Sequence, residues 1–256
     1  MASAIGQPLP FDAYRSDEHS QNGEDGVLAE LLNRLGISAA DASWCVEFGA
    51  WDGMHLSNTF ALVKKGWKAA YIEGDADRFK TLLETAKRHP EIVPLNAFVS
   101  HTAQDKNSLD NLLRDLDLPS DFDVLSIDID SHDCEVWESL TGFMPKIVVI
   151  EINSSIPPGI EKKHSAESPG NSFTSTHEVG RKKGYSLVCH TGNLIFVRDD
   201  LAAKLGIDPI FYRRPELLFR PDWLPLSATQ RMKSKIVRYG RSLVRPLRCL
   251  RRLLSA

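Results

Sequence analysis

Hydrophobic and polar residues follow one another along the chain in an order that predicts strands alternating with helices. Nearly continuous apolar runs predict strands at 44–50, 68–75, 92–100, 122–130 and 146–153. Apolar residues three and four apart predict helices at 27–35, 57–66, 76–88, 109–116 and 132–142. Such uniformly apolar strands are typical of a sheet buried on both faces, so the pattern predicts an α/β fold with a parallel, doubly wound sheet.

The C-terminal part of the pattern predicts a hairpin that joins this sheet. After a helix at 173–184, residues 185–200 have the pattern of two strands joined at a turn that contains Gly192. The connection before that helix, residues 153–172, is long for a compact domain, and loops of this length are often functional. Residues 209–227 carry four prolines and are predicted to wrap the domain in an extended form.

Charge divides the 256-residue chain into an acidic body, residues 1–230 with a helical lead-in at about 1–40, and a basic tail, residues 231–256. The tail holds nine Lys and Arg and no acid, which leaves 22 bases, 34 acids and a net charge of −12 elsewhere. Its apolar residues and arginines recur as in amphipathic helices that bind anionic membranes. Packing on the acidic body and a disordered tail are the alternatives. Nucleic-acid binding is disfavoured, because Tyr239 is the tail's single aromatic residue.

Composition favours a cytoplasmic protein. No apolar run approaches the roughly 18 residues of a membrane-spanning helix, and the N-terminus lacks the pattern of a secretory signal. The four cysteines lie far apart and form no CxxC pair, which favours reduced thiols over a disulfide or a zinc site. We therefore predict a cytoplasmic location, with the basic tail offering a peripheral contact to the inner face of the membrane.

The stretch WCVEFGAWDG, residues 44–53, places a carboxylate and glycines where the first strand ends. Ligands of open α/β sheets bind beyond the carboxyl ends of the strands, where small residues let the backbone approach them. The GxGxxG and Gly-Lys-Ser/Thr patterns are absent, which disfavours a nucleotide-binding oxidoreductase, and Glu47 favours a cationic ligand over phosphate. Glu73, at the end of the second strand, is placed to bind ribose hydroxyls. A nucleoside with a cationic chain indicates S-adenosylmethionine.

The chain resembles a known family at five segments, VEFGAWDG, SNT, YIEGD, LSIDID and VVIEIN. In this order they look like class I S-adenosylmethionine-dependent methyltransferases, and most of all like the FkbM-like group, which is associated with glycan and natural-product modification. The resemblance covers roughly residues 20–200. It implies a Rossmann-like fold with a mostly parallel seven-stranded sheet and a C-terminal antiparallel hairpin. Trp51 stands where the family motif, acid-x-Gly-x-Gly-x-Gly, has its middle glycine.

The same resemblance implies roles for residues at the strand ends. The cofactor-binding set that it implies is Glu47, Gly49, Asp52, Gly53, Glu73, Asn96, Phe98 and Asp128. The first four would hold the methionine part, the fifth the ribose, and the segment from Asn96 to Phe98 would border the adenine. Asp128 would lie near the transferred methyl group. Without a ligand, Asp52 would be a helix cap and Glu73 a surface carboxylate.

Carboxylates and a histidine crowd the end of the fourth strand, in SIDIDSHDCEVW. Asp128 and Asp130 share a strand parity, and buried carboxylates are costly, so they imply solvent, a metal or a polar ligand. In one mechanism His132 is the general base, oriented by either carboxylate. In the other, Mg²⁺ lowers the pKa of the acceptor hydroxyl and is held by Asp128, Glu151 and Asn153. A plainer interpretation makes Asp133 a helix N-cap and His132 a solvated loop residue.

Other polar residues are weaker candidates. HSQNGEDG, residues 19–26, resembles the N-terminal segment of the family, so Gln21 or Glu24 could border the cofactor, or the segment only caps the next helix. His164, in the long loop, is a candidate acceptor contact. His177 and His190 lack partners at metal-ligand spacing, so we predict structural roles for both.

These features predict an S-adenosylmethionine-dependent O-methyltransferase that acts on a hydroxyl of a sugar, a glycan or a related small molecule, in a single methyltransferase-like domain at 1–230. The glycan part follows from the resemblance alone, and N-methylation stays open. The alternative is a catalytically quiet methyltransferase-like binding module at a membrane or glycan-assembly complex. Trp51 and the pair Ser131-His132, where the FkbM-like group tends to have Gly-Asn, favour that alternative.

Overall fold

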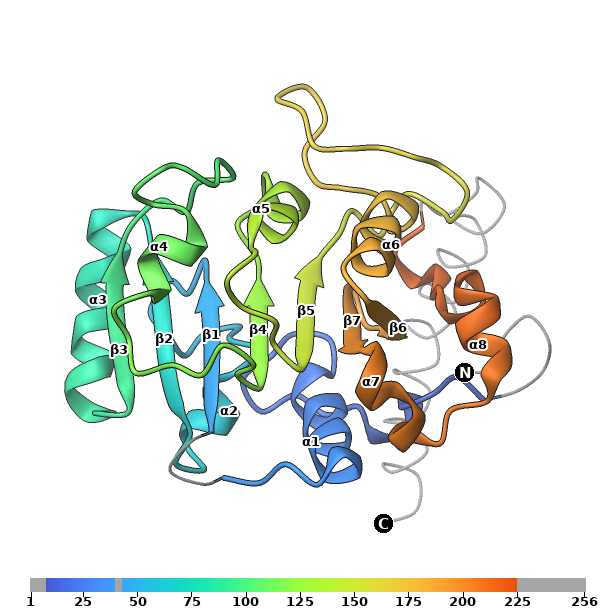
Figure 1. Cartoon of the computed structure of the whole chain (residues 1–256), viewed down its shortest axis with the longest axis horizontal. Coiled ribbons are helices and arrows are strands. Elements are labelled where there is room, and N and C mark those ends of the chain that lie inside the picture. The colour runs from blue at the N-terminus through green and yellow to red at the C-terminus, as the bar shows by residue number, and fades with distance from the viewer. Residues whose placement is uncertain (1–7, 40–42, 225–256) are drawn as a thin grey trace, which may run out of the picture. The chain divides into compact units, whose positions relative to one another are not determined.

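The structure is a computed structural model that describes residues 8–39 and 43–224. Its centre is a seven-stranded sheet in the order β3-β2-β1-β4-β5-β7-β6 (Figure 1). The strands are β1 Trp44–Phe48, β2 Lys68–Glu73, β3 Ile92–Asn96, β4 Val124–Ile127, β5 Ile147–Glu151, β6 Tyr185–His190 and β7 Asn193–Arg198. Strands β1 to β5 are parallel, and β7 is antiparallel to both of its neighbours, which confirms the predicted Rossmann-like sheet and hairpin.

Helices occupy the connections between the strands. They are α1 Glu24–Leu35, α2 Phe60–Val63, α3 Ala76–Arg88, α4 Leu109–Leu113, α5 Asp133–Ser139, α6 Phe173–Lys182, α7 Asp199–Ala202 and α8 Pro209–Arg213. Four 3₁₀ turns are η1 Asp12–Tyr14, η2 Ala203–Leu205, η3 Pro215–Leu218 and η4 Pro221–Trp223. Asp75 caps α3 and Ser108 caps α4, because their side chains accept backbone N–H groups of the first turn.

The core lies along the central strands, where every residue of β1 and β4 is buried. The chain order reverses between these two strands, with β2 and β3 on one side and β4 and β5 on the other. Figure 1 shows the carboxyl ends of β1, β4 and β5 at the upper edge of the sheet. A ligand site is expected beyond this switch point. Cys45, Cys134 and Cys189 are buried and free, as predicted for reduced thiols.

Three local predictions were wrong. Strand β4 ends at Ile127, so Asp128 and Asp130 lie in the turn after the strand and strand parity does not govern them. Helix α5 begins at Asp133 with His132 at the N-cap position, so Asp133 is not the cap. Residues 209–227 do not run extended in their described part, because Pro209, Pro215 and Pro221 each begin a helical turn, a position that proline favours.

The described residues up to Pro221 belong to one compact unit, and residues 222–224 belong to a second. The basic tail, residues 231–256, and Cys249 lie outside the described residues. Within the described ranges, no helix is both long and apolar enough to span a membrane.

Candidate functional site

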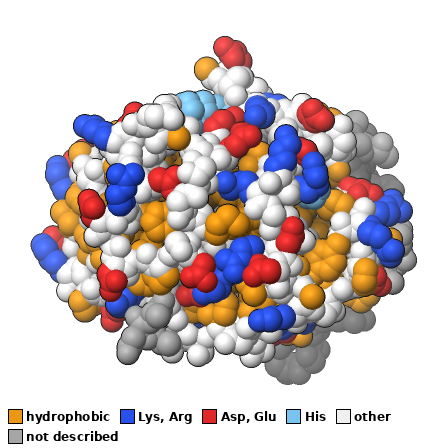
Figure 2. Space-filling view, in the orientation of Figure 1, with side chains coloured by type: hydrophobic (Ala, Val, Ile, Leu, Met, Phe, Trp, Pro, Cys, Tyr) orange, Lys and Arg blue, Asp and Glu red, His pale blue; other side chains and the backbone are white. Residues whose placement is uncertain are grey.

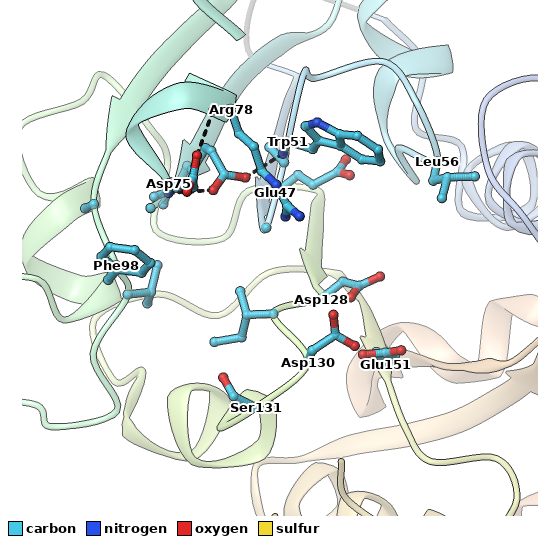
Figure 3. A pocket seen from close by; sticks show the side chains of 18 of the residues that line it. Glu47, Trp51, Leu56, Asp75, Arg78, Phe98, Asp128, Asp130, Ser131 and Glu151 are labelled. Atoms are coloured by element: carbon cyan, nitrogen blue, oxygen red, sulfur yellow. Dashed lines mark hydrogen bonds between the residues drawn. The ribbon is translucent and has the colours of Figure 1, made fainter. Parts of the chain in front are cut away.

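A cavity of about 720 Å³ lies beyond the carboxyl ends of the strands (Figure 3). Its walls come from the turns that follow β1, β2, β3 and β4, from the end of β5, and from the N-terminal segment before α1. The lining side chains that carry the argument below are Gln21, Glu47, Trp51, His55, Leu56, Glu73, Asp75, Arg78, Phe98, Asp128, Asp130, Ser131 and Glu151. The volume falls within the range of about 300–1,000 Å³ typical of small-molecule sites.

Gly49 allows the turn after β1 to pass close to the turn after β4. Its φ is +78°, and a Cβ at this position would lie 1.7 Å from the backbone oxygen of Asp128. Only glycine fits, because both the backbone angle and the missing side chain are required. Gly53 has a φ of +77° but faces the core, where a Cβ would meet Leu82 at 2.7 Å, and it does not line the cavity.

Trp51 has a backbone conformation that ordinarily favours glycine. Its φ is +48°, its N–H donates to Glu73 Oε2 over 2.8 Å, and its indole is 41% exposed. The Arg78 guanidinium lies 5.2 Å from the indole centroid. Four non-glycine residues of the described chain have positive φ, and three of them, Trp51, Leu56 and Asp130, line the cavity. Backbone strain of this kind concentrates at functional sites.

Glu47 organises the SNT segment as well as lining the cavity. Its carboxylate is buried and accepts hydrogen bonds from Ser57 Oγ (2.9 Å), Asn58 N (3.3 Å), Thr59 N (3.1 Å) and Thr59 Oγ1 (2.5 Å). Burial raises the pKa of Glu47, and these hydrogen bonds oppose that rise. The resemblance identified the SNT segment but not its role, which is to satisfy this carboxylate.

Glu73 lies at the end of β2 with both carboxylate oxygens engaged. Oε2 accepts the N–H of Trp51, and Oε1 accepts the N–H of Asp75, each over 2.8 Å. Phe98 is 74% exposed at the cavity wall, and a Cβ on Gly74 would lie 2.3 Å from its ring. Asn96 is not a lining residue, because its amide donates to the backbone oxygen of Glu73 over 2.8 Å.

Asp52 also lies outside the lining residues. Its carboxylate accepts the N–H groups of Met54 (2.9 Å) and His55 (2.8 Å), so it stabilises the turn after Trp51. This is close to the capping role that was the alternative to cofactor binding. The ring of His55 packs edge-on against Trp51, with their centroids 5.3 Å apart.

Three carboxylates form the acidic end of the cavity, which is defined here as Asp128, Asp130 and Glu151 (Figure 3). One oxygen of each lies within 4.8 Å of the others. Burial raises the pKa of Asp128 and of Glu151. Repulsion from Asp133 and Asp130 raises the pKa of Asp128 further, and repulsion from Asp128 and Asp130 raises that of Glu151. Asn153, predicted as a metal ligand, is turned to its own loop, where its Oδ1 accepts Ser155 N (3.2 Å) and Ser155 Oγ (2.5 Å).

His132 stands beside the cavity rather than among its lining residues. Its side chain is 45% exposed, and its Nδ1 lies 4.0 Å from Glu135 Oε2. The next residue, Asp133, is buried and accepts the N–H groups of Ile129 (2.9 Å) and Ser131 (3.0 Å). Asp133 therefore shapes the turn that carries Asp128 and Asp130.

Of the remaining candidate residues, one lines the cavity and the others have structural contacts elsewhere. Gln21 lines the cavity, whereas Glu24 is buried and accepts Thr191 Oγ1 over 2.7 Å. His190 is buried beside Ser154, burial lowers its pKa to about 3, and its ring is therefore uncharged at neutral pH. Burial also lowers the pKa of His177, which stacks on the ring of Phe173. These contacts agree with structural roles for both histidines.

Acidic side chains outnumber basic ones in the lining of the cavity. Six acidic side chains line the cavity: Glu47, Glu73, Asp75, Asp128, Asp130 and Glu151. Arg78 is a basic side chain among them, and sequence reasoning missed it because it lies in the first turn of α3 rather than in the turn that ends a strand. A site of this charge favours a cationic ligand.

No protein-family model matches the chain, and no curated protein matches it. Among solved structures, it resembles the N-terminal domain of EvdMO1, crystallised with SAH and D-fucose, at 12% identity and a TM-score of 0.42, over 71% of this chain and 82% of that one. It also resembles an S-adenosylmethionine-dependent methyltransferase from Aquifex aeolicus, at 14% identity and a TM-score of 0.42, over 66% of this chain and 86% of that one. Monomeric WbdD gives 12% identity and a TM-score of 0.43, over 67% of this chain and 39% of that one. At these identities and TM-scores, the similarity is limited to the general fold.

Proposed function

We propose that the protein is an S-adenosylmethionine-dependent methyltransferase that methylates a hydroxyl group of a sugar, a glycan or a related small molecule. The observation that carries the proposal is the acidic cavity at the switch point of the sheet, where six carboxylates face one guanidinium. S-adenosylmethionine carries a sulfonium, an ammonium and a carboxylate group, so its net charge is positive, and it has no phosphate for these carboxylates to repel. The cofactor thus matches the site in charge.

Four residues would hold the nucleoside and the methionine part. Each oxygen of Glu73 accepts one N–H and keeps a lone pair for a ribose hydroxyl. The exposed ring of Phe98 offers a face to the adenine. Glu47 and Gly49 border the space for the methionine part, where the missing Cβ lets the ligand approach the backbone.

S-adenosylmethionine supplies a methyl group on a positively charged sulfur. The acceptor oxygen forms a bond to that carbon as the carbon–sulfur bond breaks, and the hydroxyl proton must leave. We assign its uptake to Asp128, because burial and repulsion from Asp133 and Asp130 raise its pKa to about 7, which suits a base that works near neutral pH. Glu151, which forms a carboxyl pair with Asp128, has a pKa raised to about 9 and keeps its proton at that pH. His132, the base expected from the sequence, is not a lining residue, and the carboxyl pair is.

Mg²⁺ is a second candidate at the same place. Hard divalent cations prefer oxygen ligands, and the carboxylates of Asp128, Asp130 and Glu151 fit such an ion. Asp130 takes the place that the sequence suggested for Asn153. Methyl transfer that persists in excess EDTA would reject the metal.

A product assay tests the proposal. Purified protein is incubated with S-adenosylmethionine and a panel of sugar acceptors, and S-adenosylhomocysteine is measured by mass spectrometry. We expect turnover that Asp128→Asn lowers at least about 100-fold, in the usual range for loss of a general base. Asp77→Asn, an exposed carboxylate paired with Lys80 on α3, is the matched control and should leave turnover unchanged. Cofactor binding without turnover on any acceptor would favour the quiet binding module.

A further inference from the structure

Three imidazoles form a column beside the acidic end of the cavity, and we call it the imidazole column: His101, His132 and His164. The ring centroids of His101 and His132 lie 4.4 Å apart, and those of His132 and His164 lie 4.8 Å apart. The three rings come from the separate loops that follow β3, β4 and β5. Figure 2 shows histidine side chains at the surface of the upper edge, next to acidic side chains.

The column borders the part of the cavity that the cofactor is not assigned to fill. His132 follows directly on Asp130 and Ser131, which line the cavity. Figure 3 shows Phe98, the proposed adenine contact, across the cavity from Asp128 and Glu151. A molecule that reached the acidic end from the side of the column would therefore meet the imidazoles first.

The loop that carries His164 holds this ring in one orientation. His164 Nδ1 accepts the N–H of Gly170 over 3.2 Å, and the backbone N–H of His164 donates to Asn171 Oδ1 over 3.0 Å. The ring proton is then on Nε2, which is left as a hydrogen-bond donor. Lys162 folds the loop on itself, because its ammonium group donates to the backbone oxygens of Ser168 and Gly170, each over 2.6 Å. The wall is therefore formed before any ligand binds.

The chemistry of the column suits an uncharged ring that bears hydroxyl groups. Among the described residues, the side chains that could together bind one metal ion are those of the acidic end, and none of the three imidazoles belongs to that group. An imidazole is a planar ring with two nitrogens. It presents a flat face for a sugar-like ring and hydrogen-bonding nitrogens for hydroxyls.

The neighbouring charges disfavour an anionic acceptor. Asp128, Asp130 and Glu151 lie at the end of the cavity next to the column. The lysines of the His164 loop are engaged, because Lys162 is bound to backbone oxygens and Lys163 Nζ lies 3.7 Å from Glu138 Oε2. A carboxylate or phosphate on the acceptor would meet repulsion without a free counter-charge from these two lysines.

We propose that the imidazole column is the docking face of the methyl acceptor, and that this acceptor is an uncharged, polyhydroxylated ring. The inference rests on the proposed function, because that function places the transferred methyl group at the acidic end. It adds His101 to the acceptor side, gives His132 and His164 a binding role, and excludes acceptors that carry an anionic group on the ring being methylated.

Saturation-transfer NMR at pH 8 tests the docking face on the full chain, with and without S-adenosylhomocysteine. The probes are the methyl glycosides of glucose, galactose, mannose, rhamnose and fucose, together with those of glucuronic and galacturonic acid. We expect at least one neutral glycoside to bind and the matching uronate to bind at least about tenfold more weakly. His132→Ala and His164→Ala should each weaken the neutral glycoside at least about fivefold. His89→Ala is the control, because His89 ends α3 just before β3 begins, at the opposite edge of the sheet.

The outcomes separate this inference from the proposed function. Calorimetric titration of S-adenosylhomocysteine into each variant reports the cofactor site, and we expect no change in its affinity. If that ligand binds but no neutral glycoside does, the docking face is wrong. Equal binding of a uronate and its neutral counterpart, or undiminished glycoside binding in both histidine variants, would also overturn it. If S-adenosylhomocysteine fails to bind the unmodified protein, the proposed function fails. The glycoside measurements made in the absence of S-adenosylhomocysteine still test whether the imidazole column binds the acceptor.

Discussion

The carboxylates in the two halves of the cavity differ in their hydrogen-bond partners. At the ends of β1 and β2, Glu47 and Glu73 accept hydrogen bonds from neighbouring N–H and O–H groups. In the turn after β4, the N–H groups of Ile129 and Ser131 donate to Asp133 rather than to the carboxylates that face the cavity. The carboxylates of the first half therefore have hydrogen-bond donors without a ligand, whereas Asp128 and Glu151 hydrogen-bond to each other and are repelled by Asp130.

The largest expected effect comes from the glycine that lets the two halves meet. Gly49→Ala should lower the free energy of unfolding by at least about 3 kcal/mol, because the new Cβ overlaps the backbone of Asp128 and the φ is unfavourable. Gly66→Ala is the matched control, since Gly66 has a φ of +89° but nothing lies within 4 Å of an added Cβ. We expect a cost of about 1 kcal/mol there. Equal costs in urea unfolding would show that the close approach of the two turns is unimportant.

A smaller effect is expected at the satisfied carboxylate of the first half. Glu47→Gln keeps the size of the side chain but turns an amide NH₂ toward donors from Ser57 or Thr59. The loss of a buried acceptor should cost about 1–3 kcal/mol of unfolding free energy. Asp77→Asn, an exposed carboxylate, should cost almost nothing. Urea unfolding of both variants at pH 7 would contradict this account if Glu47→Gln were as stable as the unmodified protein.

The smallest expected effect is the dependence of stability on pH, which tests the raised pKa values at the acidic end. The pKa values of Asp128 and Glu151 are higher in the folded protein than in the unfolded chain, so the folded state binds more protons above about pH 4. The contribution of this pair to the free energy of unfolding therefore falls as pH rises through the neutral range, whereas the lowered pKa values of His190 and His177 act in the opposite direction. Allowing for solvent screening of the partly exposed Glu151, we expect the pair to contribute a loss of about 1 kcal/mol between pH 5 and pH 8. The double variant Asp128→Asn/Glu151→Gln should lack this contribution, and identical pH profiles of the two proteins would remove the pair from the account.

Residues at the strand ends could be predicted because their placement depends on local pattern. An apolar run followed by glycine located Gly49, and the end of the next run located Glu73. Asp52 and Gly53, only a few residues further on, do not line the cavity, because the turn after Trp51 directs them to backbone groups and to the core.

The acidic end was harder to predict because it depends on where a strand stops and on contacts between distant loops. Asp133 holds the turn that brings Asp128 and Asp130 into the cavity, whereas the sequence made it a helix cap. Asn153 turns to its own loop, and no pattern at that position indicates this. The prolines after residue 208 were interpreted as extended chain, although proline also favours the first turn of a helix.

The central claim is that the cavity binds S-adenosylmethionine through the end of β2, and calorimetric titration tests it most directly. At pH 8, we expect the unmodified protein and Asp77→Asn to bind the cofactor with the same Kd, at or below about 100 μM. Glu73→Ala should bind at least about tenfold more weakly, because the ribose hydroxyls lose their acceptor. Absence of binding to the unmodified protein, or a Glu73→Ala variant that binds as tightly, would contradict the account.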